Sequence, residues 1–414
     1  MRIPKWQFSR RQFIAAGSSF SGLVVTPTER LSALEGGAST KRPNIYDRLG
    51  VRTRINAKGT YTFLTGSLMP PEISRAMEEA SQHYVWLPEL HEAVGKKLAA
   101  MLGVEAAMVT SGAAGAIMLG TAACIAGKDP ERLKQIPDLT GLKSEVIIQK
   151  THRNAFDHAI RNVGVKLIVV ETLEEMESAI SDKTAMMYFL NAAQNHGKVG
   201  LEKFVEVGKR RGVPTFNDAA ADVPPVSHLS DYCKMGFDMV AFSGGKGLRG
   251  PQCAGLLLGR RDLIEAALLN NNPHEDAIGR PCKVGKEEVI GMFAAVERYL
   301  KVDHEAEWKD WEARIEVIEK TLATVPGITA TRFVPEIANH VPHLGLKWDE
   351  SAFKLTAADC AKQLEDGEPS IVCLVGEESH GLSVTPFMMK PGEERIVARR
   401  LKEVLTAAQR KAET

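Results

Sequence analysis

Seven short apolar runs recur along the middle of the chain and define its predicted architecture. Helical patterns separate most of them, including those at 112–126, 173–180 and 201–211. Continuous apolar strands that alternate with helices are typical of a mainly parallel sheet covered by helices on both faces. The pattern therefore predicts an α/β fold with strands at 106–110, 145–149, 166–170, 185–190, 214–217, 239–242 and 254–258.

The sequence changes character near residue 286, where two long amphipathic helices begin. They are expected at 286–300 and 305–323, with strands at 328–333, 341–347 and 370–375 and a closing helix at 392–411. This pattern is typical of a smaller α+β domain. Ahead of the sheet, helices are expected at 70–81, where two prolines open the first turn, and at 91–102.

These patterns divide the chain into four parts. An N-terminal segment (1–40) precedes an arm and helix (41–95), a large domain (96–290) and a small domain (291–414). The first part contains S-R-R-Q-F-I at Ser9–Ile14, followed by a modest apolar run at 15–25. Twin arginines in this context are typical of a signal for export of folded proteins, so the periplasm and the export machinery are the expected destination and partner. An ordinary basic N-terminus on a cytoplasmic protein is the alternative.

Overall charge, cysteine spacing and hydropathy argue against several classes of function. The 414 residues carry 52 Lys plus Arg and 52 Asp plus Glu, so no global positive field attracts nucleic acid. The six cysteines form no C-x-x-C pair and no metal-ligand spacing, so no metal site is expected and most should be small buried apolar residues. No later stretch reaches membrane-spanning length, which predicts no stable membrane association.

Three features fall where predicted strands end, which is where open α/β sheets bind ligands. The turn V-T-S-G-A-A opens the helix at 112, Asp218 ends a strand, and Lys246 follows the next strand in S-G-G-K-G-L-R-G-P. Free N–H groups at the helix start favour an anion such as phosphate. An anion loop, a carboxylate and then a lysine is the order that a pyridoxal 5'-phosphate site requires, with the lysine forming a Schiff base.

The chain resembles a known family over roughly residues 45–300. The segment F-S-G-G-K-G-L-R-G-P-Q-C-A-G-L-L-L-G, with R-I-N-A-K-G-T at Arg54–Thr60, V-T-S-G-A-A at Val109–Ala114 and G-R-P-C-K-V-G-K-E-E at Gly279–Glu288, carries the resemblance. It is similar to the seryl-tRNA(Sec) selenium transferases and the D-glucosaminate-6-phosphate ammonia-lyases. The resemblance implies the fold type I pyridoxal phosphate fold, with a seven-stranded sheet and a smaller C-terminal domain.

The resemblance also implies residue roles. Lys246 is the expected attachment point and Asp218 the expected partner of the pyridine nitrogen, while His152 is placed to stack on the ring. Phosphate contacts are expected from Ser111, Gly112, Ala113 and Ser243. Asn191 and Gln194 are expected to approach either the ring oxygen or the substrate. Separately from the resemblance, the cations near the arm and the domain junction are candidates for binding an anionic substrate: Arg54, Lys58, Arg280 and Lys283. Arg249 faces either the substrate or solvent.

The expected reaction is α,β-elimination by an ammonia-lyase acting on a hydroxylated amino acid or amino-sugar acid, with Lys246 removing the α-proton. Transamination, racemisation and aldol cleavage share the first carbanion and stay open, as does a non-catalytic binding protein. Selenium transfer is not expected, because the charge balance provides no basic surface for tRNA and only the export signal precedes the arm. Arm and domain-junction segments of this fold commonly reach a neighbouring subunit, so a homodimer or larger homo-oligomer is expected.

Overall fold

The computed structural model describes residues 44–376 and 381–413, and the predicted export signal lies outside them. Contacts divide the chain into two units, and the boundary in the sequence falls between Arg52 and Thr53. The described part of the first unit contains one short helix, α2 (Ile45–Arg48), whose first turn is capped by the Asn44 side chain. All the elements below belong to the second unit. No helix among the described residues is long and apolar enough to cross a bilayer.

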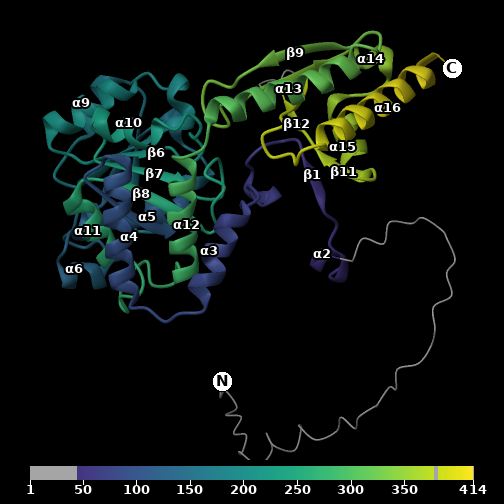
Figure 1. Cartoon of the computed structure of the whole chain (residues 1–414). Coiled ribbons are helices and arrows are strands. Elements are labelled where there is room, and N and C mark those ends of the chain that lie inside the picture. Colours follow the sequence, from purple (N-terminus) through teal and green to yellow (C-terminus); the bar gives the residue numbers. More distant parts are fainter. Residues whose placement is uncertain (1–43, 377–380, 414) are drawn as a thin grey trace, which may run out of the picture. The chain divides into compact units, whose positions relative to one another are not determined.

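The largest sheet of the second unit has seven strands, in the order β2-β8-β7-β6-β5-β3-β4. It lies among helices, as the labelled strands β6, β7 and β8 show in Figure 1. β8 runs antiparallel to both of its neighbours, and the other pairs are parallel. The seven predicted strands and the mainly parallel α/β fold are confirmed. The strands are β2 (Ala106–Ser111), β3 (Glu145–Gln149), β4 (Lys166–Val170), β5 (Thr184–Leu190), β6 (Thr215–Asp218), β7 (Met239–Ser243) and β8 (Ala254–Gly259).

Helices cover both faces of this sheet. One face packs against α4 (Leu87–Leu102), α8 (Leu173–Ala179), α9 (Leu201–Arg211), α10 (His228–Met235) and α12 (Lys286–Tyr299). The other packs against α5 (Gly112–Ala126), α7 (His158–Arg161) and α11 (Arg261–Leu269), with α6 (Pro130–Gln135) beside α5. α5 carries no charged residue and is buried over most of its length, so it lies in the core with its first turn at the sheet edge.

The C-terminal region builds a separate core around a four-stranded sheet of order β12-β13-β10-β9. It contains α13 (His304–Leu322), β9 (Thr329–Phe333), β10 (His343–Lys347), α14 (Glu350–Phe353), α15 (Ala357–Asp366), β12 (Leu374–Gly376), β13 (Gly381–Val384) and α16 (Glu393–Glu413). A two-stranded parallel ladder joins β1 (Arg54–Asn56) to β11 (Ser370–Val372), so part of the predicted arm is a strand. The predicted boundary at residue 290 stays a prediction.

Three local expectations differ from the structure. The run at 370–375 forms two strands in different sheets, β11 and β12, because β1 and β13 recruit its two halves separately. The helix expected at 91–102 begins at Leu87, and α3 (Pro71–Ser81) begins at the second proline. All six cysteines are free thiols, but the expectation that most are buried is wrong. Cys360 and Cys373 are buried, Cys253 is exposed, and the other three are partly exposed.

Candidate active site

The predicted chemical residues meet at the edge of the large sheet where β2, β6 and β7 end. These three strands point the same way, because β8 is antiparallel to both β2 and β7. Asp218 is the last residue of β6, and the turn with Lys246 follows β7. Ser111 ends β2 and directly precedes α5. The sheet therefore brings the anion loop, the carboxylate and the lysine to one edge.

Asp218 is held in a fixed orientation by two donors. The Tyr188 hydroxyl donates to Oδ2 over 2.7 Å, and the Ala220 backbone N–H donates to Oδ1 over 3.1 Å. Only 5% of the residue is exposed. Burial raises the pKa of the carboxyl, while the Tyr188 bond and the Lys246 charge partly offset that rise. A buried carboxylate of this kind gains stability from a nearby cation, such as a protonated ring nitrogen.

The loop that carries Lys246 is fixed by its glycines. A Cβ atom on Gly247 would overlap the Val223 carbonyl oxygen, and one on Gly245 would crowd the Gln252 backbone. Earlier in the same segment, at the end of β7, the Ser243 backbone N–H donates to the Ala220 carbonyl over 3.2 Å. The loop therefore runs beside residues 219–223 in close contact, so Lys246 is not a freely solvated surface lysine.

Two carboxylates lie near the Lys246 amine. The contacts of Ser243 with Ala220 and of Gly247 with Val223 place Asp222 alongside Lys246. Burial lowers the pKa of Lys246, whereas the charges of Asp218 and Asp222 raise it. A lowered pKa increases the neutral fraction of an amine, and the neutral amine is the form that acts as nucleophile or base.

The start of α5 provides the anion cradle. No described side chain caps its first turn, and Ser111, Gly112 and Ala113 are each partly exposed. A Cβ atom on Gly255 of β8 would overlap the Gly112 carbonyl group, so only glycine lets this strand lie against the helix start. Ser243 pairs with Gly255 in the sheet ladder and therefore lies next to the same turn. Together these residues fit a bound phosphate.

The arrangement fits pyridoxal phosphate as a whole. An uncapped helix start, a buried carboxylate and a half-buried lysine correspond to the phosphate, ring nitrogen and aldehyde of that molecule. The individual roles predicted for Lys246, Asp218, Ser111, Gly112, Ala113 and Ser243 stay predictions.

His152 lies beyond the end of β3, in the interior of the same region. Its ring has no exposed surface and packs edge-on against Phe189, with 4.4 Å between ring centroids. The Leu190 backbone N–H donates to Nδ1 over 3.2 Å. Burial lowers the pKa of His152 to about 4, so its imidazole is neutral near pH 7. Its predicted stacking role stays a prediction.

Sequence reasoning missed a buried polar cluster beside the lysine loop. Asn191 donates from Nδ2 to Asp222 and also to the Tyr232 hydroxyl, the latter over 2.9 Å. Asp222 is 3% exposed, and burial raises its pKa to about 6. Asn191 and Gln194, both predicted substrate contacts, line a cavity with Asp222. The D-A-A-A-D spacing at 218–222 was the available signal, but it does not show which carboxylate faces the lysine.

The four cations proposed as substrate contacts do not line this cavity. Arg54 lies on β1 and pairs with Glu365 over 3.8 Å, and the Lys58 ammonium lies 4.7 Å from the centroid of the Tyr61 ring. Arg280 and Lys283 lie in the turns between α11 and α12, and Lys283 is exposed. Their substrate roles stay predictions.

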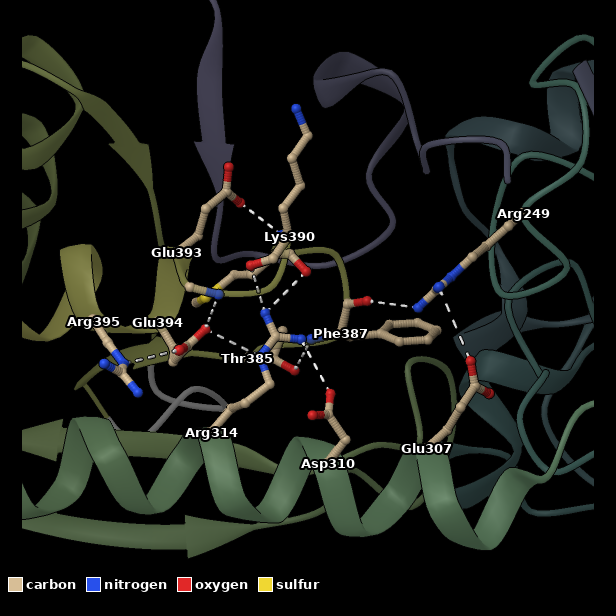
Figure 2. Close-up of polar contacts among 12 residues, drawn as sticks. Arg249, Glu307, Asp310, Arg314, Thr385, Phe387, Lys390, Glu393, Glu394 and Arg395 are labelled. Atoms are coloured by element: carbon tan, nitrogen blue, oxygen red, sulfur yellow. Dashed lines mark hydrogen bonds and ion pairs between the residues drawn. The ribbon is translucent and has the colours of Figure 1, made fainter. Parts of the chain in front are cut away.

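Arg249, whose orientation the sequence left open, points toward the C-terminal core. Its guanidinium donates to the Phe387 carbonyl over 3.0 Å and lies 4.0 Å from the Glu307 carboxylate (Figure 2). The residue has a positive φ of 54°, which costs strain in a side chain of this size. The arginine is one-quarter exposed, so it is neither fully solvated nor free of protein partners.

A second arginine fixes the segment that Arg249 contacts. Arg314 of α13 donates to the carbonyls of Met389 and Lys390 over 3.0 and 2.8 Å and pairs with Glu394 over 3.2 Å (Figure 2). The residues at 387–394 are therefore bound on one side to the lysine loop and on the other to α13.

Comparisons with known proteins support this interpretation. Residues 74–277 match the class-V aminotransferase family. A 5'-C-glycyluridine monooxygenase-decarboxylase from Streptomyces sp is 30% identical over 374 residues, covering 87% of this chain and 92% of the relative. An L-seryl-tRNA(Sec) selenium transferase from Alkaliphilus metalliredigens is 29% identical, covering 62% of this chain and 57% of that protein.

The D-glucosaminate-6-phosphate ammonia lyase of Salmonella typhimurium is similar in sequence, with 28% identity covering 87% of this chain and 98% of the lyase. A solved structure of a D-glucosaminate-6-phosphate ammonia-lyase has a TM-score of 0.77 and 28% identity, covering 89% of this chain and all of that one. The predicted resemblance and the fold type I architecture are confirmed. The chain thus belongs to the class-V aminotransferase family and is a pyridoxal phosphate-dependent enzyme.

Proposed function

We propose that the protein is an ammonia-lyase that eliminates a β-substituent from a hydroxylated amino acid or amino-sugar acid. The observation that carries this proposal is the nearly full-length likeness to an ammonia lyase in both sequence and structure. The position of Lys246 beside two buried carboxylates is compatible with the proton transfers that such a reaction requires.

Each residue has a defined task in this proposal. Bound pyridoxal phosphate supplies an electron sink for the charge left when an α-proton is removed. Lys246 takes that proton at Nζ, and its lowered pKa favours the neutral amine. Asp218 would accept the hydrogen bond of the protonated ring nitrogen, with Tyr188 fixing the carboxylate. The N–H groups at the start of α5 would hold the phosphate.

The overall reaction is balanced without an added oxidant. The α-proton and the β-hydroxyl leave together as water, which forms a double bond between the α- and β-carbons. The released enamine becomes an imine, and one water hydrolyses it to a 2-oxo acid and ammonia. Transamination instead requires a keto-acid acceptor, and oxidative decarboxylation, the type of chemistry named for the Streptomyces relative, consumes oxygen and releases carbon dioxide.

The test is a screen of the cofactor-loaded enzyme against D- and L-hydroxyamino acids and amino-sugar acids. We expect ammonia and a 2-oxo acid in equal amounts, with no keto acid added and no oxygen consumed. Lys246→Ala should abolish this turnover, whereas replacing the exposed Lys234, which donates to Ser230, should not. Obligatory amino-group exchange or oxygen consumption would contradict the proposal.

We also propose a homodimer or a multiple of it. Phe63 and Tyr84 are fully exposed, and Trp86 is 80% exposed. Large aromatic side chains are enriched at protein interfaces, so these exposed aromatic residues support the proposal. Light scattering should give a mass of at least two chains, and Trp86→Glu with Phe63→Glu should reduce it.

A further inference from the structure

The lysine loop, residues 244–250, closes on itself through backbone hydrogen bonds. The Gly250 N–H donates to the Gly244 carbonyl over 2.7 Å, and the Arg249 N–H donates to the Lys246 carbonyl over 2.9 Å. The second bond joins Arg249 directly to the backbone of the lysine. A displacement of Arg249 is therefore passed on to the point from which the Lys246 side chain begins.

Arg249 occupies a position that suits glycine better than arginine. Its φ of 54° lies in the left-handed region, which glycine adopts without strain and a long side chain does not. Strained residues of this kind persist where surrounding contacts hold them, and they cluster at functional sites. The turn itself gives no reason for an arginine here. What distinguishes arginine from glycine at this position is the set of contacts that its side chain makes.

The guanidinium of Arg249 is held by residues of the C-terminal region. It donates to the Phe387 carbonyl over 3.0 Å, lies 5.9 Å from the centroid of the Phe387 ring, and lies 4.0 Å from the Glu307 carboxylate (Figure 2). Burial lowers the pKa of the guanidinium and the Glu307 charge raises it, but an arginine stays protonated in either case. These contacts compensate for placing a charge where only 25% of the side chain is exposed.

Phe387 is itself a fixed point. It is 3% exposed, and its ring packs edge-on against Trp311 of α13, with 5.2 Å between ring centroids. The carbonyls that follow it, at 389 and 390, accept hydrogen bonds from Arg314 of the same helix (Figure 2). Arg249 therefore joins the lysine loop to a packed segment.

Two other attachments hold the lysine loop, and each comes from a different part of the chain. The Ser67 hydroxyl donates to the Gly245 carbonyl over 3.0 Å. Gly247 lies so close to the Val223 carbonyl that a Cβ atom would overlap it. Arg249 adds an attachment from a third direction in the sequence. Three separate attachments fix the orientation of a short loop, whereas two leave it free to rotate about the line that joins them.

We propose that Arg249 is a positioning residue that orients Lys246 by holding the lysine loop to the Phe387 segment. It touches neither substrate nor cofactor in this proposal and acts only through the lysine. The amine then stays buried beside Asp218 and Asp222, where it captures pyridoxal phosphate. This inference goes beyond the lyase function, because capture of the cofactor precedes elimination, transamination and every other reaction of the bound cofactor.

The experiment follows the capture of pyridoxal phosphate by the full-length protein after its cofactor has been removed. The rate at which the visible absorption band appears is measured against pH, because the neutral amine is the form that reacts. Burial lowers the pKa of Lys246 more than the charges of Asp218 and Asp222 raise it. A loosened loop lets water reach the amine, so its pKa rises toward the ordinary value and the neutral fraction at pH 7 falls. Loss of the Arg249 contact should therefore move the rate profile to higher pH.

Three variants of Arg249 test this. Arg249→Met keeps the length of the side chain but has no donor, so it should move the profile upward by about half a pH unit or more, which is roughly threefold slower capture at neutral pH. Arg249→Gly should do the same, and it carries the test if the first variant does not fold, because glycine suits this φ. Arg249→Lys keeps a charge and a donor and should shift the profile less.

Arg261→Met is the matched control. It also removes a guanidinium that donates to a backbone carbonyl, that of Glu105 over 2.8 Å, but it lies at the start of α11, near the opposite end of the sheet. We expect its pH profile to match that of the wild type. Circular dichroism of every variant shows that the fold persists.

The outcomes separate a positioning role from a purely structural one. If Arg249 serves only the turn, Arg249→Gly keeps the wild-type profile, because glycine meets the demands of the backbone. A wild-type profile in both the Met and the Gly variants, or an equal shift in Arg261→Met, would overturn the role of Arg249 and leave Lys246 as the attachment point. Absence of a visible band in the wild type would overturn both. None of these outcomes depends on ammonia release, so the lyase proposal is tested separately.

Discussion

At the scale of single residues, Tyr188 orients the Asp218 carboxylate, which we propose binds the cofactor ring. Its hydroxyl donates to Asp218 Oδ2 over 2.7 Å, and this bond lowers a carboxyl pKa that burial raises. Without the bond, Asp218 is more readily protonated and less fixed in orientation. A hydrogen bond to a charged group contributes roughly 1.5–3 kcal/mol.

Tyr188→Phe should therefore weaken pyridoxal phosphate binding by about tenfold or more, measured by titrating the cofactor-free protein and following absorbance. Tyr299→Phe is the matched control, because the buried Tyr299 hydroxyl has no hydrogen-bond partner among the residues that the structure describes. Equal affinities for the two variants would contradict the role given to Tyr188.

The sequence identifies some of these residues and not others, for a physical reason. Lys246 and Asp218 were identifiable because chain order and strand ends place them together. Tyr188 lies inside an apolar strand, so the sequence pattern predicts a core residue there. Its hydroxyl reaches Asp218 because the neighbouring strand β6 ends in that residue. The sequence does not identify Asp222 either, because the residues that hydrogen-bond to its carboxylate, Asn191 and Tyr232, come from two other elements.

At the scale of elements, the anion cradle depends on how closely β8 approaches α5. Gly255→Ala adds a methyl group that overlaps Gly112, so the start of the helix must move away from the strand. We expect cofactor affinity to fall at least tenfold while the fold persists, as measured by cofactor titration and circular dichroism. Gly200→Ala is the control, since a Cβ atom there meets no neighbouring atom within 4 Å. A loss of affinity in both variants would contradict this account.

Local pattern predicted the large sheet well because most of its strands contain apolar runs that are buried, although β4 is partly exposed and β6 ends in polar residues. It failed at 370–375, where a single run divides between β1 and β13. Partner choice depends on segments hundreds of residues away, such as the arm at β1, so a local pattern does not determine it. The sequence did not predict that segment 336–340 lines the cavity beside Asp222, for the same reason.

At the scale of the whole molecule, we propose export to the periplasm in the folded state with the cofactor already bound. The twin arginines at Arg10 and Arg11 support this proposal. Arg10→Lys with Arg11→Lys should retain the protein in the cytoplasm, as followed by cell fractionation. Arg30→Lys with Arg42→Lys, two arginines outside the motif, should leave location unchanged. Periplasmic location of the first variant would contradict the proposal.

The central claim is that Lys246 binds the cofactor covalently. The most direct measurement is reduction of the cofactor-loaded protein with borohydride, followed by proteolysis and mass spectrometry of the peptides. The account predicts one pyridoxyl-modified lysine, Lys246. Modification of a different lysine, or of none while the cofactor is bound, would contradict it.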